Sequence, residues 1–231
     1  MPTSWESVEM QALTYIKNDL SLMHDMEVRL PVFYNRMSAY MVIGMAKFNK
    51  PPEVRLKLAN NTAPKFESVV YYAEEAISAA TPIETGESGY DIASAGIVSE
   101  DAVGTPTYTP LPIVGYDTET GNITLSVDVA ADTEIVFDFY KSGEFKSTLN
   151  IAEADLLAMC IYNAWEHRFD NNALERIPKI RDSSSNTISE ASQTNANTAR
   201  LRQVDEKLND DLRAYEQSDE YMRSVLKIRT Y

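Results

Sequence analysis

The chain has 231 residues, is 44% hydrophobic and 24% charged, and carries a net charge of −14 with a single cysteine, Cys160. This composition excludes a largely disordered chain, and a chain of this length can bury a sizeable core. One cysteine excludes an intramolecular disulfide and a cysteine-based zinc site.

The acidic excess is concentrated in the middle of the sequence. The net charge is −1 over residues 1–83, −10 over residues 84–150 and −3 over residues 151–231. An acidic surface repels phosphate backbones, which argues against ordinary nucleic-acid binding. An acidic surface suits the lining of a channel along which DNA slides without binding.

Neither a secretion signal nor a membrane helix is expected from the sequence. The start, MPTSWESVEMQ, lacks the basic stretch and the apolar segment of a signal peptide. No run approaches the roughly 20 apolar residues that a membrane helix needs. We therefore expect a protein made and kept in a reducing cytoplasm.

The first 63 residues are predicted to be helical. The spacing of Thr3 and Glu6 matches a capping box, which predicts a first helix over 4–20. A second helix should begin near Asp25, with an apolar stripe from Leu30 to Phe48. The sequence Asn49–Pro52 stops it, and its two prolines suit the first turn of a short helix through residues 53–59.

Residues 64–149 are predicted to form a small antiparallel β-domain inserted into the helical protein. Residues 64–76 mix β-branched and aromatic side chains with charges, which fits either a strand or a helix, and we expect an extended segment there. The clearest strands alternate apolar and polar residues over 123–129 and 135–139. Residues 118–122 supply the turn before the first of these strands, and residues 130–133 connect the two.

Residues 150–231 are predicted to return to helix. The segment from Ile151 to Phe169 carries a broad apolar face that includes Leu156, Met159, Cys160 and Tyr162. A last helix is expected over roughly 196–226, where apolar residues recur at spacings of three, four and seven. The predicted fold class is therefore α+β, a mostly α-helical bundle with one inserted β-domain.

Candidate chemical groups are few, and each has a plain structural alternative. His167 lies next to Glu166 and one turn from Asp170, which would allow a general base oriented by a carboxylate. A histidine near a helix C-terminus is also favourable to the helix dipole, and we favour that role. His24, with Asp25 close by, would need further ligands from elsewhere to hold a metal.

The remaining acidic groups indicate solvated surface. The pairs Glu74–Glu75, Glu100–Asp101 and Asp210–Asp211 are adjacent in sequence, so they do not lie side by side as a catalytic dyad would. The turn that contains Asp117, Glu119 and Asn122 does not have the spacing of an EF-hand loop. With no phosphate loop or nucleophile motif either, we expect no enzymatic activity, no cofactor and no metal.

Residues 182–198, DSSSNTISEASQTNANT, contain one large apolar side chain, Ile188, between two strongly helical segments. Amides and hydroxyls of this kind satisfy backbone groups in irregular segments or bind another chain. We interpret the stretch as a polar arm that lies against a neighbouring subunit, and expect its amide exchange to slow on assembly. The arm's candidate contact residues are Ser183, Ser184, Ser185, Asn186, Thr187, Ile188, Gln193, Asn195 and Asn197.

Tyrosines are abundant, with 13 in the chain. A tyrosine combines large apolar area with a polar end, which suits an interface anchor as well as a core. The candidate anchors near the C-terminus are Tyr215, Tyr221 and Tyr231, and Tyr71, Tyr72 and Tyr140 are candidates in the β-domain. The sequence leaves interface and core roles equally open.

The segments AYMVIGMAKFNKPPE, DFYKSGEF, AWEHRF, ERIPKIRDSSS and SEASQTNANTARLRQ resemble virion proteins of tailed bacteriophages. The resemblance is to head–tail connector or neck-ring (adaptor) proteins, and covers most of the chain. It implies a homo-oligomeric ring, commonly of twelve copies, that docks on the portal protein and extends the DNA channel. Expected partners are further copies of the chain, the portal and neighbouring neck or tail proteins. DNA is expected to pass through the channel without sequence-specific binding.

Three other functions stay open at this point. A tail or baseplate component would have similar biochemistry at another place in the virion. A hydrolase would use Glu166, His167 and Asp170, and a carbohydrate-binding β-module on a helical stem is a further alternative. Both tryptophans, Trp5 and Trp165, lie in predicted helices, which argues against a sugar-stacking platform in the β part.

Overall fold

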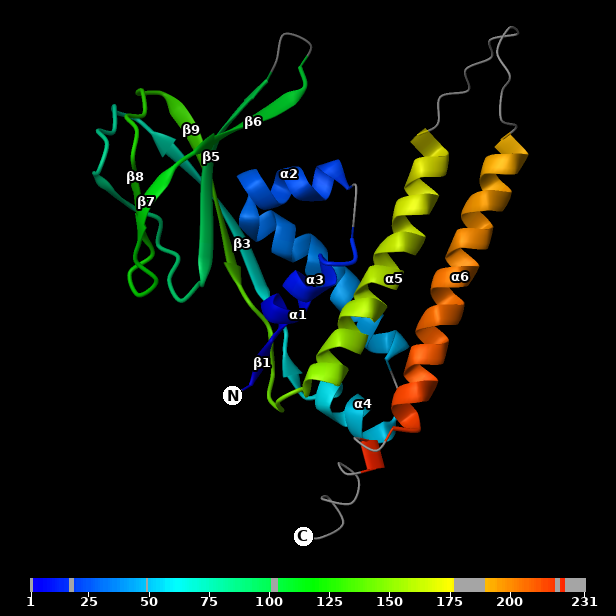
Figure 1. Ribbon diagram of the computed structural model, residues 1–231. Coiled ribbons are helices and arrows are strands. Elements are labelled where there is room, and N and C mark those ends of the chain that lie inside the picture. The colour runs from blue at the N-terminus through cyan, green and yellow to red at the C-terminus, as the bar shows by residue number, and fades with distance from the viewer. Residues whose placement is uncertain are drawn as a thin grey trace, which may run out of the picture.

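The computed structural model describes residues 2–16, 19–48, 50–100, 104–176, 190–218 and 221–222, with backbone only for residues 20–21, 169–176 and 190–197. Within these ranges the chain forms six helices and three antiparallel sheets, which confirms the predicted α+β class (Figure 1). Among the described residues, none of the helices contains an apolar stretch of the length that a membrane span requires.

Helix α1 (Trp5–Ala12) is shorter than predicted, and its cap lies one residue later. The Ser4 hydroxyl, rather than that of Thr3, accepts the backbone N–H of Ser7. The predicted helix over 4–20 is wrong because the Asp19 side chain caps a separate helix, α2 (Leu20–Val28), by accepting the N–H of Leu22.

Helix α3 (Leu30–Lys47) starts later than the predicted position near Asp25. Pro31 lies in its first turn, where a missing N–H costs nothing, and the same proline would break a helix that ran through from Asp25. Helix α4 (Pro52–Ala59) follows as predicted, with Pro52 in its first turn.

The β-part is a two-layer structure. Strands β3 (Lys65–Ala73), β9 (Thr133–Lys141), β5 (Ile92–Glu100) and β6 (Pro106–Leu111) form one sheet in that order. Strands β4 (Pro82–Glu84), β8 (Asn122–Leu125) and β7 (Ile113–Tyr116) form the second. The short strands β1 (Thr3–Ser4), β10 (Glu144–Phe145) and β2 (Asn61–Thr62) tie the N-terminus to the end of the β-part.

The extended segment predicted over 64–76 is confirmed by β3. The strand predicted over 123–129 ends at Leu125, and Val127 is exposed because the chain leaves the sheet there. β8 and β9 lie in different sheets, so residues 130–133 connect two layers. The turn before β8 is confirmed, with the Asp117 carboxylate accepting the N–H groups of Glu119 and Thr120.

Two hydrophobic cores meet at β9. Ile135, Phe137 and Phe139 face the core between the two sheets. Tyr140, from the opposite face of the strand, enters the helical core. Because side chains alternate along a strand, one strand serves both cores.

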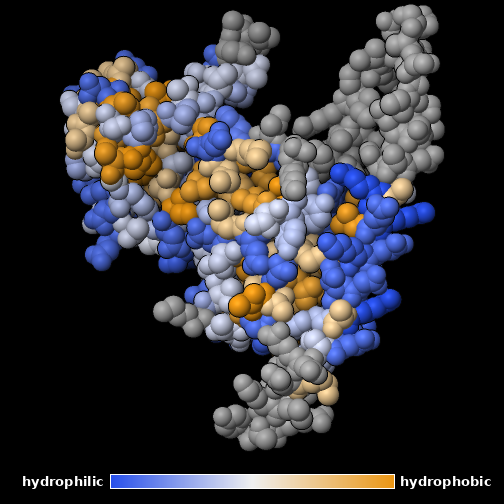
Figure 2. Space-filling view, viewed as in Figure 1, coloured by the Kyte–Doolittle hydropathy of each residue, from blue (hydrophilic) through white to orange (hydrophobic). Residues whose placement is uncertain are grey.

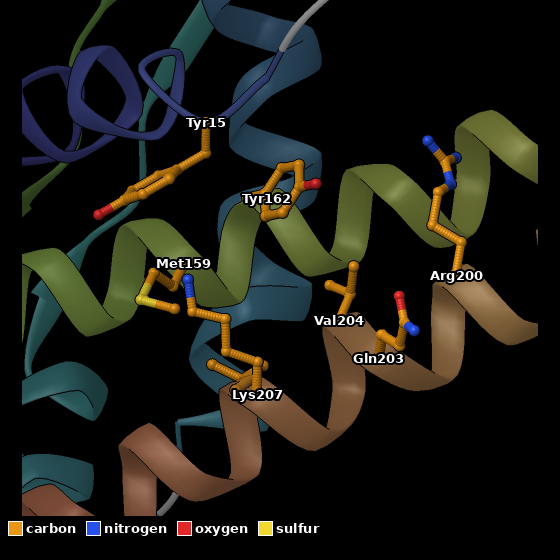
Figure 3. A pocket seen from close by; sticks show the side chains of 8 residues that line it. Tyr15, Met159, Tyr162, Arg200, Gln203, Val204 and Lys207 are labelled. Atoms are coloured by element: carbon orange, nitrogen blue, oxygen red, sulfur yellow. The ribbon is translucent and has the colours of Figure 1, made fainter.

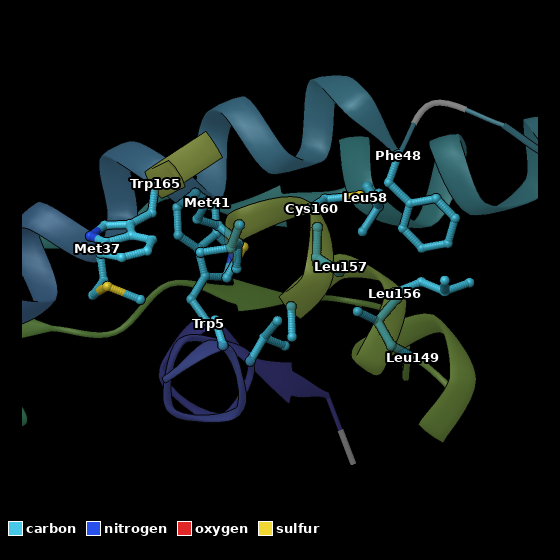
Figure 4. Packing of buried hydrophobic residues seen from close by; sticks show 14 of the residues in the cluster. Trp5, Met37, Met41, Phe48, Leu58, Leu149, Leu156, Leu157, Cys160 and Trp165 are labelled. Carbon is cyan, nitrogen blue, oxygen red and sulfur yellow. The ribbon is translucent and has the colours of Figure 1, made fainter. Parts of the chain in front are cut away.

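The helical core lies between α1, α3, α4 and α5 (Ile151–Arg176), and Figure 4 shows Trp165 close to Met37 within it. Gly44 of α3 lets the helices approach closely, since a Cβ there would lie 3.1 Å from the backbone nitrogen of Ile161 on α5. Ile151 is 88% exposed, so the predicted apolar face of α5 does not include it.

Helix α6 (Glu190–Glu216) starts six residues before the predicted position and ends earlier. It lies along α5, so the two form a long helical hairpin (Figure 1). Among its described side chains, only Leu208 and Tyr215 are buried. From residue 198 onward, most of the helix surface is therefore polar and exposed.

Candidate functional site

Four polar side chains link α3, α5 and α6, and we call this group the polar seam: Lys47, Asn163, His167 and Asp205. Asn163 is fully buried and accepts a hydrogen bond from the Lys47 ammonium. Its amide nitrogen donates to the Asp205 carboxylate at 2.8 Å, and the His167 Nε2 lies 2.9 Å from the same oxygen. One carboxylate of α6 thus satisfies two side chains of α5.

The electrostatics of the polar seam favour an ionised Asp205. Burial by itself would raise the pKa of this carboxyl, but hydrogen bonds from His167 and Asn163, with the nearby charge of Lys47, lower it below its ordinary value. The seam therefore keeps a carboxylate that joins α6 to the rest of the helical part.

Glu166 forms a second link between the two helices. It is 4% exposed; the Tyr162 hydroxyl donates to its Oε1 at 2.5 Å, and Arg200 of α6 lies 2.8 Å from its Oε2. Glu166 and His167 are thus each directed to a different residue of α6. This arrangement joins helices and gives the hydrolase hypothesis no support, while the Asp170 side chain lies outside the described residues.

A cavity of about 230 Å³ lies beside the polar seam, between α5, α6 and the turn after α1 (Figure 3). Its apolar lining includes Met159 and Val204, and its polar rim includes Lys207. The Tyr15 hydroxyl at its edge donates to Asp155 at 2.6 Å, which together with burial raises the pKa of Tyr15 to about 12. This tyrosine is therefore a neutral hydrogen-bond donor and not a base.

A buried carboxyl group, Glu9 of α1, lies within the helical core. It is fully buried, and its Oε1 accepts a hydrogen bond from the Ser38 hydroxyl at 3.0 Å. Its Oε2 has no hydrogen-bond partner among the described residues. Burial raises the pKa of Glu9 to about 8, against the opposing hydrogen bond from Ser38 and with a contribution from the charge of Glu6.

The structure describes only part of the predicted arm over residues 182–198. Ser183 to Ile188 lie outside the described residues. Gln193, Asn195 and Asn197 lie in α6, so the last nine residues of the predicted arm are helical where an irregular segment was expected. The polar arm thus stays a prediction for residues 182–189, directly before a helix of the same composition.

The C-terminal tyrosines differ in their placement. Tyr215 is 6% exposed, packs edge-on against Phe48 and donates to Glu153 at 3.1 Å. It therefore belongs to the core of its own chain and offers a neighbour little surface, which corrects its proposed role as an anchor. The Tyr221 hydroxyl lies 3.4 Å from Glu53, and Tyr231 lies outside the described residues.

The β-domain tyrosines divide in the same way. Tyr140 is fully buried, and Tyr71 packs edge-on against Phe137. Tyr72 is 54% exposed and donates to Asp132 at 3.0 Å. Of these three side chains, Tyr72 retains surface for a partner.

No cluster of metal-ligating side chains occurs around His24 or elsewhere within the described ranges. The polar seam was missed from sequence because Lys47 and Asp205 are far from Asn163 along the chain. A signal existed in the spacing of Asn163, Glu166 and His167, which places three polar side chains on one face of the helix. Comparison of the chain with protein-family models, curated proteins and solved structures found no match.

Proposed function

We propose that this chain is a structural virion protein of a tailed bacteriophage. Copies of the chain form a ring, dodecameric by the resemblance of its sequence, that joins the portal to the tail and extends the DNA channel. The protein works by geometry: helices pack around the ring, and acidic surface keeps DNA mobile during packaging and ejection.

The single observation that carries the proposal is the exposed polar surface of α6. A 27-residue helix with two buried side chains among those described has far more polar surface than packing on α5 requires. Figure 2 shows this side of the molecule as predominantly blue. A long helix of this kind is typical of surfaces that bridge to other units, and in a ring it would lie against the next copy.

The charge distribution supports the same proposal. The β-part carries most of the net charge of −14, and acidic side chains such as Glu84, Glu119 and Asp128 are exposed on it. Repulsion between such a surface and DNA lowers friction in a channel, whereas a basic lining would retain the genome.

Particle size in solution tests the proposal directly. We expect native mass spectrometry and negative-stain images of the purified chain, alone and mixed with the portal protein of the same phage, to show closed rings. Ring formation should rise with concentration or on addition of portal, because contacts between copies obey mass action. A chain that stays monomeric at all concentrations and with portal would refute the proposal.

Location in the particle separates the connector from a tail or baseplate component. Removing the gene should yield DNA-filled heads without attached tails if the chain joins the two. Complete tails free of heads, together with antibody labelling at the neck of wild-type virions, would agree with this result. Labelling at the distal end of the tail would support the baseplate alternative instead.

A further inference from the structure

Helix α4 presents an apolar and basic outer face. Its buried side chains are Val54 and Leu58, and Lys57 turns inward to form an ion pair with Glu153 at 2.6 Å. The side that remains exposed consists of Pro52, Arg55, Leu56 and Ala59. Leu56 is 71% exposed.

The charge on the exposed side of residues 47–65 is mainly positive, and Glu216 of α6 lies near Lys50. Residues 47–65 contain five basic residues and one acidic residue, Glu53, for a net charge of +4. Lys50, Arg55 and Lys65 are exposed, while Glu53 is half-buried. We call the four exposed residues of α4, with Lys50, the basic face.

The four-stranded sheet carries the complementary surface on the side away from its core. Tyr72 is paired with Glu134 and Val70 with Val136 across strands β3 and β9. Directly opposite side chains share a face, so these four residues lie together, opposite the face that buries Ile135. Val70 and Tyr72 are 59% and 54% exposed.

Acidic groups lie at one end of this apolar surface, while Arg29, paired with the buried Asp138, lies further along the same face. Glu134 lies within it, and Glu74, Glu75 and Asp132 lie at the adjoining ends of β3 and β9, all exposed. We call Val70, Tyr72, Glu134 and Val136, with these three acids, the acidic face. β3 is also an edge strand, paired only with β9 among the described strands.

We propose that the basic face of one copy docks on the acidic face of the next copy. Leu56 would pack against Val70 and Tyr72, and Arg55 would pair with the carboxylates around them. This inference rests on the proposed ring and names a contact between its copies in addition to that of α6.

Two properties of the chain point to a second copy as the partner. The faces match in both apolar character and charge, and they are present in equal number on each chain. They also lie at opposite ends of the molecule, with α4 at the bottom and the upper ends of β3 and β9 at the upper left of Figure 1. One chain therefore cannot pair its own faces, and a contact between different faces builds a ring when its rotation closes.

Cross-linking between two variants, each with one added cysteine, tests the contact without requiring a complete ring. Leu56→Cys and Val70→Cys chains, one of them tagged, are mixed and oxidised. The native Cys160 is buried, which raises its thiol pKa to about 12 and leaves it unreactive. We expect a disulfide-linked heterodimer in the mixture, and much less dimer from either variant alone.

Charge reversal tests the electrostatic part. Arg55→Glu and Glu134→Arg should each weaken association about tenfold, and the two variants mixed with each other should recover most of it. Raising the ionic strength should weaken wild-type association as well, since it screens exposed charges. The matched control is Glu119→Arg in the turn before β8, which is exposed and lies outside the two faces and outside α6.

The outcomes separate this contact from the proposed ring. Rings that persist in Arg55→Glu and Leu56→Asp, without cross-links between the Leu56→Cys and Val70→Cys chains, would overturn the contact and leave the ring standing. Absence of rings with and without portal would refute the proposed function. Cross-linking of Leu56→Cys to portal alone, or loss of DNA retention as the main effect of Arg55→Glu, would assign the basic face to that partner and overturn the inference.

Discussion

The buried carboxyl of Glu9 gives the sharpest test of the helical core. Its pKa is raised from an ordinary value of 4.5 to about 8 in the folded chain, chiefly by burial. Between these two values the folded state keeps a proton that the unfolded state has released. Stability therefore falls as pH rises through this window, and is highest with respect to this group below pH 4.5.

The size of the effect follows from the shift. At about 1.36 kcal/mol per pH unit, the interval from 4.5 to about 8 corresponds to a loss of roughly 5 kcal/mol by pH 8.5, and about 3 kcal/mol by pH 7. A loss of this order is a substantial part of the stability of a typical domain.

The variant Glu9→Gln removes the titration and retains the shape. The glutamine carbonyl can accept the Ser38 hydroxyl as Oε1 does now, while its buried NH₂ adds a cost that does not vary with pH. Urea denaturation followed by circular dichroism at pH 5, 7 and 8.5 measures both proteins. We expect the unfolding free energy of the variant, relative to that of the wild type, to increase by several kcal/mol as the pH rises over this range.

The test depends on how the difference in unfolding free energy between the two proteins changes with pH. The absolute size of this difference at any one pH does not enter. Other carboxylates titrate equally in both proteins, so their contributions cancel in the difference. A difference in unfolding free energy that stays constant from pH 5 to 8.5 would refute the raised pKa and the reasoning from burial.

Three further substitutions test how the parts are joined. Asp138→Asn removes the fully buried carboxylate that accepts two hydrogen bonds from Arg29, and should cost about 2–3 kcal/mol in urea denaturation because Arg29 stays partly solvated. Gly44→Val should cost about 2 kcal/mol or more by pushing α3 from Ile161, measured as a lower thermal midpoint. His167→Gln should cost less than about 1 kcal/mol and leave ring formation in native mass spectrometry unchanged, because its contact with α6 is half-exposed.

Each of these three substitutions has its own control or its own outcome that would contradict the prediction. Glu119→Gln, in an exposed turn, controls for loss of a charge in the β-part, and an equal effect would remove the special role of Asp138. Gly115→Val places a side chain where the nearest atoms, on Thr124, are 3.7 Å away, so equal destabilisation would contradict close helix packing at Gly44. Loss of rings in His167→Gln would show that the polar seam acts in assembly.

Local patterns in the sequence were enough for the elements with a strong period or a clear terminator. Pro51 and Pro52 predicted α4, alternation predicted β9, and the apolar repeat predicted α5. The break between α1 and α2 was missed because an apolar repeat continues across it, while a single side chain, Asp19, caps the new helix. The predicted start of α3 near Asp25 was too early, because Pro31 fits the first turn of a helix and not its interior.

Contacts between distant residues were decided by the tertiary structure alone. Nothing in the local sequence shows that β8 and β9 belong to different sheets, or that Lys47, Asn163 and Asp205 meet, because periodicity identifies a buried face but not what covers it. The same holds for Tyr215. A tyrosine side chain suits a core and an interface equally, and only the contact with Phe48 in the structure assigns this one to the core. The sequence by itself determined the α+β class and the uneven charge, which depend on local pattern and composition, while packing decided which polar groups are buried and which faces are left for partners.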